Sequence, residues 1–152
     1  MKTYFDTSNL IKLYVLEENS PAALEIIRAN KNPVPFSHLV ELELRTAIRL
    51  KRGRGEITAP EQRASLQALE SDLAKGILAR PDYDLEAVYR RAETLSAKHA
   101  AATMARSADI WHVSAALEIG CKAFASFDDR QRTLAALAGL ELMPSNIAKK
   151  KP

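Results

Sequence analysis

Four acidic side chains stand at positions where they could do chemistry together, and two of them end β-prone runs. Asp6 directly follows the run Thr3–Phe5, and Asp128 directly follows an apolar run that ends at Phe127. In an open parallel sheet, ligands usually bind in the crevice beyond the carboxyl ends of the strands. If the two runs are neighbouring parallel strands, both carboxylates point into one cleft. Either acid alone could equally cap the helix that follows it.

Glu43 is the third acid, and it lies in a segment with helical periodicity. At 100° per residue it projects onto an apolar face with Leu39, Ala47 and Leu50. Glu41 instead projects onto the charged face, where Arg45 is an i, i+4 partner. A carboxylate on an apolar face costs free energy unless a cation or hydrogen bonds compensate it. We therefore favour a functional role for Glu43 over an acid at the edge of the buried face.

Asp109 repeats this pattern in a later helix. It shares a face with Val113 and Ala116, whereas Glu118 lies opposite. Its place in the first helical turn also suits the helix dipole, which is the structural alternative. One such acid decides little, but four of them predict a shared site.

An all-oxygen ligand set determines which metal the site would hold. The chain has one cysteine and no His-x-x-x-His spacing, so the usual zinc ligand sets are missing. Carboxylates suit Mg²⁺ or Mn²⁺. Such an ion can activate water and stabilise the charge on a phosphodiester as its bond breaks. The net charge of +3 is compatible with a polyanionic partner without identifying one.

The elements that must position these residues alternate between short strands and helices. Strands are predicted over 2–5, 32–36, 122–127 and 140–143. Helices are predicted over 9–16, from 20, and over 38–52, 59–74, 84–99, 107–119 and 130–138. Thr7 or Ser8, Ser37 and Ser107 are the expected N-caps, and Thr58 begins a capping box. The alternation predicts an α/β sandwich around a short, mostly parallel sheet with helices on both faces.

Length and composition are those of a single globular domain. With 152 residues, of which 47% are hydrophobic and 27% charged, we expect one domain over 1–145 and a basic tail over 146–152. No run of 18 apolar residues and no secretion signal is present. Cys121 is unpaired, which suits a reducing compartment, so we expect a cytoplasmic protein without membrane contact.

Four segments together resemble the motifs of the PIN-domain family, and within it the VapC-type toxins of bacterial toxin–antitoxin pairs. In chain order the segments are Tyr4–Tyr14, Ser37–Arg45, Arg106–Val113 and Ser126–Gln131. The acids of these motifs fall on Asp6, Glu43, Asp109 and Asp128, and the resemblance runs from about residue 3 to residue 144.

The resemblance implies a PIN-like three-layer sandwich and a Mg²⁺- or Mn²⁺-dependent endoribonuclease with an RNA substrate. It also implies a homodimer and a cognate VapB-type antitoxin that blocks the cleft. One departure is Ser126, where the family often has threonine, and a hydroxyl is retained. Another is Asp129 beside Asp128. Strand periodicity from Ser126 favours Asp128 as the ligand.

Several residues around the acids keep two interpretations. Thr7 and Ser8 either contact a water or phosphate through their hydroxyls or cap a helix. Arg106 either contacts phosphate or a cleft carboxylate, or forms a surface salt bridge. For Trp111 and His112 a core role is favoured over catalysis.

Two other functions compete with a metal-dependent nuclease. One is a phosphotransferase with Asp6 as its nucleophile. The haloacid-dehalogenase pattern requires a second acid two positions after the nucleophile, and Ser8 stands there, so this class is disfavoured. A non-catalytic RNA-binding or interaction module with a PIN-like fold remains the alternative. We also expect surplus apolar surface for a partner on the hairpin over 37–74 or on the first two helices. The hairpin residues concerned are Leu42, Leu44, Ile48, Leu66 and Leu69.

Overall fold

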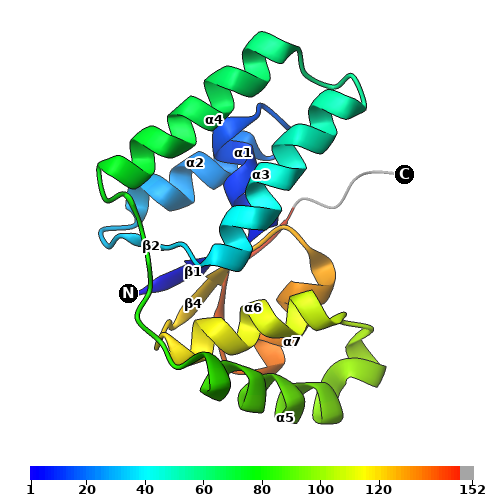
Figure 1. The fold of residues 1–152 in the computed structure, drawn as a ribbon. Coiled ribbons are helices and arrows are strands. Elements are labelled where there is room, and N and C mark those ends of the chain that lie inside the picture. Colours follow the sequence, from blue (N-terminus) through cyan, green and yellow to red (C-terminus); the bar gives the residue numbers. More distant parts are fainter. Residues whose placement is uncertain (148–152) are drawn as a thin grey trace. The chain divides into compact units, whose positions relative to one another are not determined.

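The computed structural model describes residues 1–147, and the chain forms two compact units. One unit comprises residues 1–4 together with the chain from Asp82 onward, and the other comprises Phe5–Pro81. The division falls within the first strand, β1 (Thr3–Phe5). Figure 1 draws both as ribbons and labels most of their helices and strands.

The first unit is built on a three-stranded sheet in the order β1-β4-β5. Strand β4 (Ala123–Ala125) pairs in parallel with β5 (Glu141–Met143). Its helices are α5 (Leu85–Thr103), α6 (Ser107–Glu118) and α7 (Asp129–Leu137). Helix α6 packs against both α5 and α7, and α7 also packs against β5. All residues of β1 and β4 are buried, as expected for strands of a parallel sheet.

Aromatic side chains fill the core of this unit. Tyr4 stacks on Phe124 with ring centroids 5.4 Å apart, and its hydroxyl lies 2.9 Å from Nδ1 of His112. The rings of Trp111 and His112 meet edge to face. Both are buried, so the predicted core roles of Trp111 and His112 are confirmed.

The second unit is mainly helical. It contains α1 (Thr7–Tyr14), α2 (Ser20–Ala29), α3 (His38–Gly53) and α4 (Ala59–Ala74), and α1 contacts the other three. Two short parallel strands, β2 (Val34–Pro35) and β3 (Leu78–Ala79), complete it. Pro35 fits because the amides of Val34 and Phe36 donate to β3 and its flank, 2.8 Å to Ile77 O and 2.8 Å to Ala79 O. The sequence did not predict β3, which is too short to show a period.

Helix α3 buries a different face from the one predicted. Its fully buried row is Val40, Leu44 and Ile48, at the i, i+4 spacing of one helix face. Leu50, which was expected beside Glu43 on the apolar face, is 53% exposed. Glu43 therefore lies on the flank of the buried row.

The expected surplus of apolar surface on the α3–α4 hairpin is largely wrong. Leu44, Ile48 and Leu69 are fully buried as this unit's own core. Leu66 is partly buried, and Leu42 is 62% exposed.

Several helix starts follow the sequence prediction and two differ from it. Ser37 caps α3 by accepting from Val40 N, and Thr58 with Glu61 forms the predicted capping box of α4. The cap of α1 is Asp6 rather than Thr7 or Ser8. Ser107 is the first residue of α6 rather than its cap. Strand β4 ends at Ala125, short of the predicted Phe127.

The predicted α/β class with a short parallel sheet is confirmed. Of the predicted tail over 146–152, Lys149, Lys150 and Lys151 lie outside the described residues. None of the helices between residues 1 and 147 has the length and apolar character needed to cross a bilayer.

Candidate active site

Asp6 is a buried carboxylate held at the start of α1. Its side chain is 0% exposed. Oδ1 accepts a hydrogen bond from Asn9 N at 2.9 Å, and Ser8 Oγ lies 2.8 Å from both carboxylate oxygens. The helix N-terminus and the hydroxyl stabilise the negative charge and fix the side chain's orientation. Asp6 is therefore the cap of α1, the structural role that the sequence left open for it.

Glu43 is tied to the same end of α1 through a threonine. Thr7 Oγ1 donates to Glu43 Oε2 at 2.6 Å, a short charge-assisted hydrogen bond. Since Thr7 is the neighbour of Asp6 in the chain, Asp6 and Glu43 are joined through one residue. Thr7 is not the cap of α1, and its hydroxyl contacts a carboxylate rather than the predicted water or phosphate.

Glu41, two residues before Glu43, is engaged in ion pairs instead. It receives a hydrogen bond from Arg45 at 2.9 Å, the i, i+4 pair that the sequence predicted, and it also pairs with Arg80. The hydrogen bond from Arg80 is the largest reason that the pKa of Glu41 is lowered, and Arg45 adds to it against the effect of burial. Glu41 thus behaves as a structural acid and gives a natural control for Glu43.

Asp109 lies in the first turn of α6, where its carboxylate faces back to the helix start. Its Oδ2 accepts from Arg106 N at 2.8 Å, so the structural alternative of a capping acid is observed. The Arg106 side chain is exposed, and the described part of the chain offers it no ion pair. The expected surface salt bridge of Arg106 is therefore not found there.

Asp128 is the N-cap of α7. Its Oδ1 accepts from Arg130 N at 2.9 Å and from Gln131 N at 3.0 Å, and its own amide donates to Ser126 Oγ at 3.0 Å. Asp129 begins the helix and is exposed. Asp128 and Asp129 therefore differ in that Asp128 caps α7. The strand periodicity used in the prediction does not apply to them, because β4 ends before both residues.

Sequence reasoning missed the buried Arg132, which fixes the loop before Asp128. Its guanidinium donates to Ser126 O at 3.0 Å and to Pro144 O at 2.9 Å. The loop is thus held through both the hydroxyl and the carbonyl of Ser126. The one signal in the sequence is an arginine beside the apolar positions Leu134 and Ala135, and a surface arginine gives the same pattern.

The oxygen atoms of the four acids are suitable ligands for a hard cation, and two of the acids lie in each compact unit. Asp6 and Glu43 belong to one compact unit, and Asp109 and Asp128 to the other. Every donor is an oxygen, and the hydroxyls of Thr7, Ser8 and Ser126 add neutral oxygens beside them. Within residues 1–147, no three His, Cys, Asp or Glu side chains form a cluster that could hold a metal ion. The residue types, rather than a preformed cluster, indicate Mg²⁺ or Mn²⁺.

Comparison with known proteins gives one family. A model described as PIN domain matches residues 3–137, which include all of these acids. No curated protein matches the chain. PIN domains are generally nucleases, so the match indicates a nuclease-type fold and a nucleic-acid substrate. Because the match covers most of its length, the chain belongs to the PIN domain family.

Proposed function

We propose that this protein is a divalent-metal-dependent endoribonuclease with Asp6, Glu43, Asp109 and Asp128 as its catalytic metal ligands. The observation that carries the proposal is the linked pair at the start of α1, a fully buried Asp6 beside a Glu43 that Thr7 holds in place. Burying carboxylates costs free energy, and a bound cation would compensate it. Family membership supports the nuclease class.

The protein's own residues orient the ligands in this proposal. Bound Mg²⁺ or Mn²⁺ would supply a Lewis acid that activates water and stabilises charge on the phosphodiester. Ser8 and the amide of Asn9 fix the Asp6 carboxylate, and Thr7 fixes Glu43. In the other unit, the first-turn amides of α7 orient Asp128.

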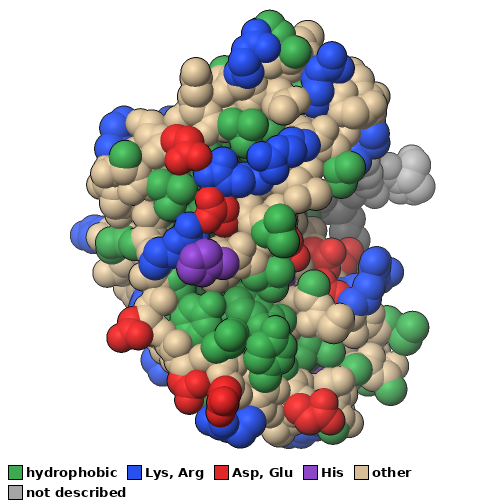
Figure 2. Space-filling model, viewed as in Figure 1, with side chains coloured by type: hydrophobic (Ala, Val, Ile, Leu, Met, Phe, Trp, Pro, Cys, Tyr) green, Lys and Arg blue, Asp and Glu red, His purple; other side chains and the backbone are tan. Residues whose placement is uncertain are grey.

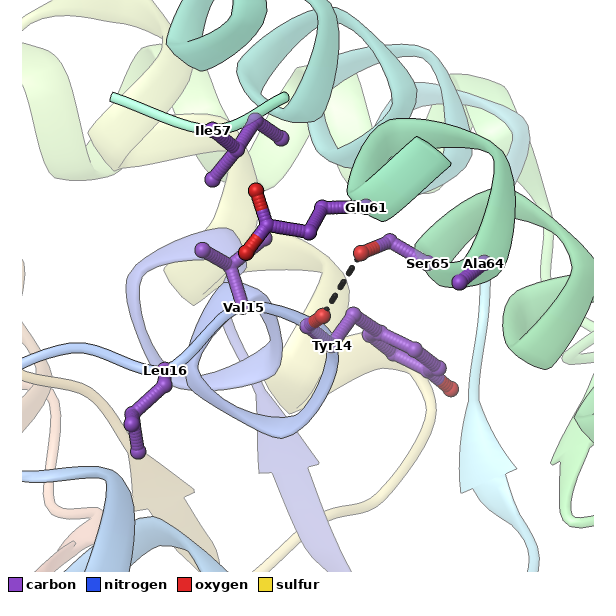
Figure 3. A pocket seen from close by; sticks show the side chains of 7 residues that line it. All are labelled: Tyr14, Val15, Leu16, Ile57, Glu61, Ala64 and Ser65. Carbon is purple, nitrogen blue, oxygen red and sulfur yellow. Dashed lines mark hydrogen bonds between the residues drawn. The ribbon is translucent and has the colours of Figure 1, made fainter. Parts of the chain in front are cut away.

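We further propose that the protein is the VapC-type toxin of a toxin–antitoxin pair and acts in the cytoplasm. The resemblance of the four motifs supports this, and the second unit has a surface suited to a VapB-type antitoxin. A cavity of about 290 Å³ between the end of α1 and α4 is lined by Tyr14, Val15, Leu16, Ile57, Glu61, Ala64 and Ser65. Figure 3 shows Ser65 hydrogen-bonded to the carbonyl of Tyr14 at 2.7 Å. Leu16 at its rim is 91% exposed, which favours an apolar partner.

A homodimer is part of the same proposal, and the first unit offers a surface for it. Figure 2 shows hydrophobic side chains gathered over α5 and α6. Leu85 and Tyr89 are more than half exposed there. A cavity of about 180 Å³ between Tyr89 and Trp111 lies beside them.

A cleavage assay tests the catalytic proposal. Asp6→Ala, Glu43→Ala, Asp109→Ala and Asp128→Ala should each lower Mn²⁺-dependent RNA cleavage by at least about 100-fold, because even outer-shell partners of a metal cost about 10–100-fold. Glu41→Gln is the control and should change cleavage much less. Full activity of a natively folded Asp109→Ala protein would remove Asp109 from the site. No metal-dependent cleavage by the parent, with RNA still bound, would favour the non-catalytic RNA-binding module.

A further inference from the structure

Helices α1 and α7 begin in the same way, with a capping aspartate and an amide side chain three residues later. Asn9 follows Asp6, and Gln131 follows Asp128. Both amide side chains belong to buried residues, with exposures of 0% for Asn9 and 8% for Gln131. Asn9 Oδ1, Asn9 Nδ2 and Gln131 Oε1 have no hydrogen-bond partner within residues 1–147.

Unsatisfied polar atoms of this kind are costly, so their position is informative. A buried amide without a hydrogen-bond partner lowers the stability of the folded state. A Glu or Gln at this helix position commonly reaches back to the backbone amide of the cap. Helix α4 shows that ordinary arrangement, because Glu61 Oε2 accepts from Thr58 N at 2.6 Å. Asn9 and Gln131 do not make this bond.

Both amides start next to the carboxylates proposed as metal ligands. Asn9 N lies 2.9 Å from Asp6 Oδ1, and Gln131 N lies 3.0 Å from Asp128 Oδ1. The side-chain amides of Asn9 and Gln131 therefore belong to the same residues whose backbone N–H groups contact these carboxylates. The fourth atom of this kind in the described part of the chain, Asn30 Oδ1, is at the C-terminal cap of α2.

We propose that Asn9 and Gln131 are positioning residues, which hydrogen-bond to water molecules coordinated by the metal at Asp6 and at Asp128. The proposal rests on the metal-dependent nuclease function given above. Mg²⁺ keeps several of its waters when proteins bind it. A metal-bound water donates hydrogen bonds, and the amide oxygens of Asn9 and Gln131 are acceptors. Each amide oxygen thereby gains a hydrogen-bond partner and orients the water shell.

The test replaces each amide by an apolar side chain of similar size and measures metal binding without RNA. In Asn9→Leu and Gln131→Met, the dissociation constant for Mn²⁺ alone should rise by about 10–100-fold, the usual effect of losing an outer-shell partner. The melting temperature in chelator should stay unchanged or rise, because an unsatisfied buried polar group is removed. Asn9→Ala, measured in parallel, removes the same atoms without adding bulk. Asn30→Ala is the matched control and should leave Mn²⁺ affinity unchanged.

The outcomes separate this inference from the proposed function. Parent-like Mn²⁺ affinity in Asn9→Ala and Gln131→Met would overturn the positioning role and leave the nuclease proposal standing. A lower melting temperature in chelator with unchanged Mn²⁺ affinity would overturn it too, by indicating a structural amide. A parent protein that does not bind Mn²⁺ would contradict the proposed function itself.

Discussion

Thr7 shows how one hydroxyl can organise a site. A threonine hydroxyl can donate one hydrogen bond. Thr7 Oγ1 donates it to Glu43 Oε2 at 2.6 Å. The same residue stands in the first turn of α1, directly after the buried Asp6. The orientation of the Glu43 carboxylate therefore depends on Thr7, a residue that has no acidic group of its own.

Thr7→Val tests this dependence at the residue scale. Valine keeps the shape of threonine and removes the donor, so Glu43 loses a hydrogen bond worth about 1.5–3 kcal/mol. We expect kcat/KM for RNA cleavage to fall by about 10–100-fold, and the melting temperature to fall by roughly 3–12 °C because the lost hydrogen bond also stabilises the fold. Thr46→Val, at an exposed position of α3, is the control. Parent activity in Thr7→Val would show that Glu43 does not need this contact.

The residue types of the site could be predicted from sequence, and their local contacts could not. Asp6 and Asp128 stand out because an acid directly after an apolar run is visible in the pattern. The cap of α1 was assigned to Thr7 or Ser8 rather than to Asp6, because all three side chains are good N-caps and compete for one place. The burial of Arg132 depends on carbonyls at 126 and 144, which only the folded chain brings together.

At the scale of elements, an ion-pair network fixes α3 in the second unit. Glu17, after α1, pairs with Lys12 at 2.9 Å and with Lys51 near the end of α3. Lys51 also pairs with Glu56 at 2.8 Å. Burial by itself raises the pKa of Glu17, but the hydrogen bonds from Lys51 and Lys12 outweigh it, so this pKa is lowered.

Glu17→Gln should therefore destabilise the protein in a pH-dependent way. An acid whose pKa is lowered by folding stabilises the folded state above its ordinary pKa of 4.5, and that contribution is lost as the pH falls through the lowered value. At pH 7 we expect a loss of about 1 kcal/mol in the free energy of unfolding, shrinking below about pH 4.5. Urea unfolding at several pH values measures it. Glu25→Gln, an exposed acid on α2, is the control, and a loss independent of pH would contradict the role of the charge.

Helices whose ends carry capping residues were predicted well, and strands that depend on pairing with a distant segment were not. The capping box at Thr58 and the caps of α3 follow from side-chain chemistry within a few residues. The β3 strand exists because Leu78 pairs with Val34, a contact distant in sequence. The buried face of α3 carries Val40, Leu44 and Ile48 rather than the predicted residues, because the packing of α3 against α1 and α4 decides which face is buried.

At the scale of the whole molecule, the proposal of four metal-binding acids predicts a dependence of stability on metal. Partly buried carboxylates that share a site repel each other when no cation is bound. Mg²⁺ or Mn²⁺ that binds only the folded protein should raise the melting temperature, with about 2.7 kcal/mol of added stability at a hundred times its dissociation constant.

Asp109→Asn separates the electrostatic role of this acid from its capping role. Asparagine keeps an acceptor oxygen for the Arg106 amide, which lies 2.8 Å from the carboxylate, and removes one negative charge. Without metal, the variant should be as stable as the parent or more so, because repulsion falls. With excess Mn²⁺, its rise in melting temperature should be smaller than the parent's, and RNA cleavage should be lost. The measurement is a pair of melting curves at neutral pH, one with chelator and one with Mn²⁺, for parent and variant.

Glu86→Gln provides the control for this comparison. Glu86 is also an acid in the first turn of a helix of the same unit, but it pairs with Arg90 on the surface of α5. Its replacement removes an equal charge and should leave the Mn²⁺-dependent rise intact. If metal-free Asp109→Asn melts well below the parent, the carboxylate acts chiefly as the cap of α6. If it keeps the full metal-dependent rise, Asp109 is not a metal ligand, and the other three acids must hold the ion without it.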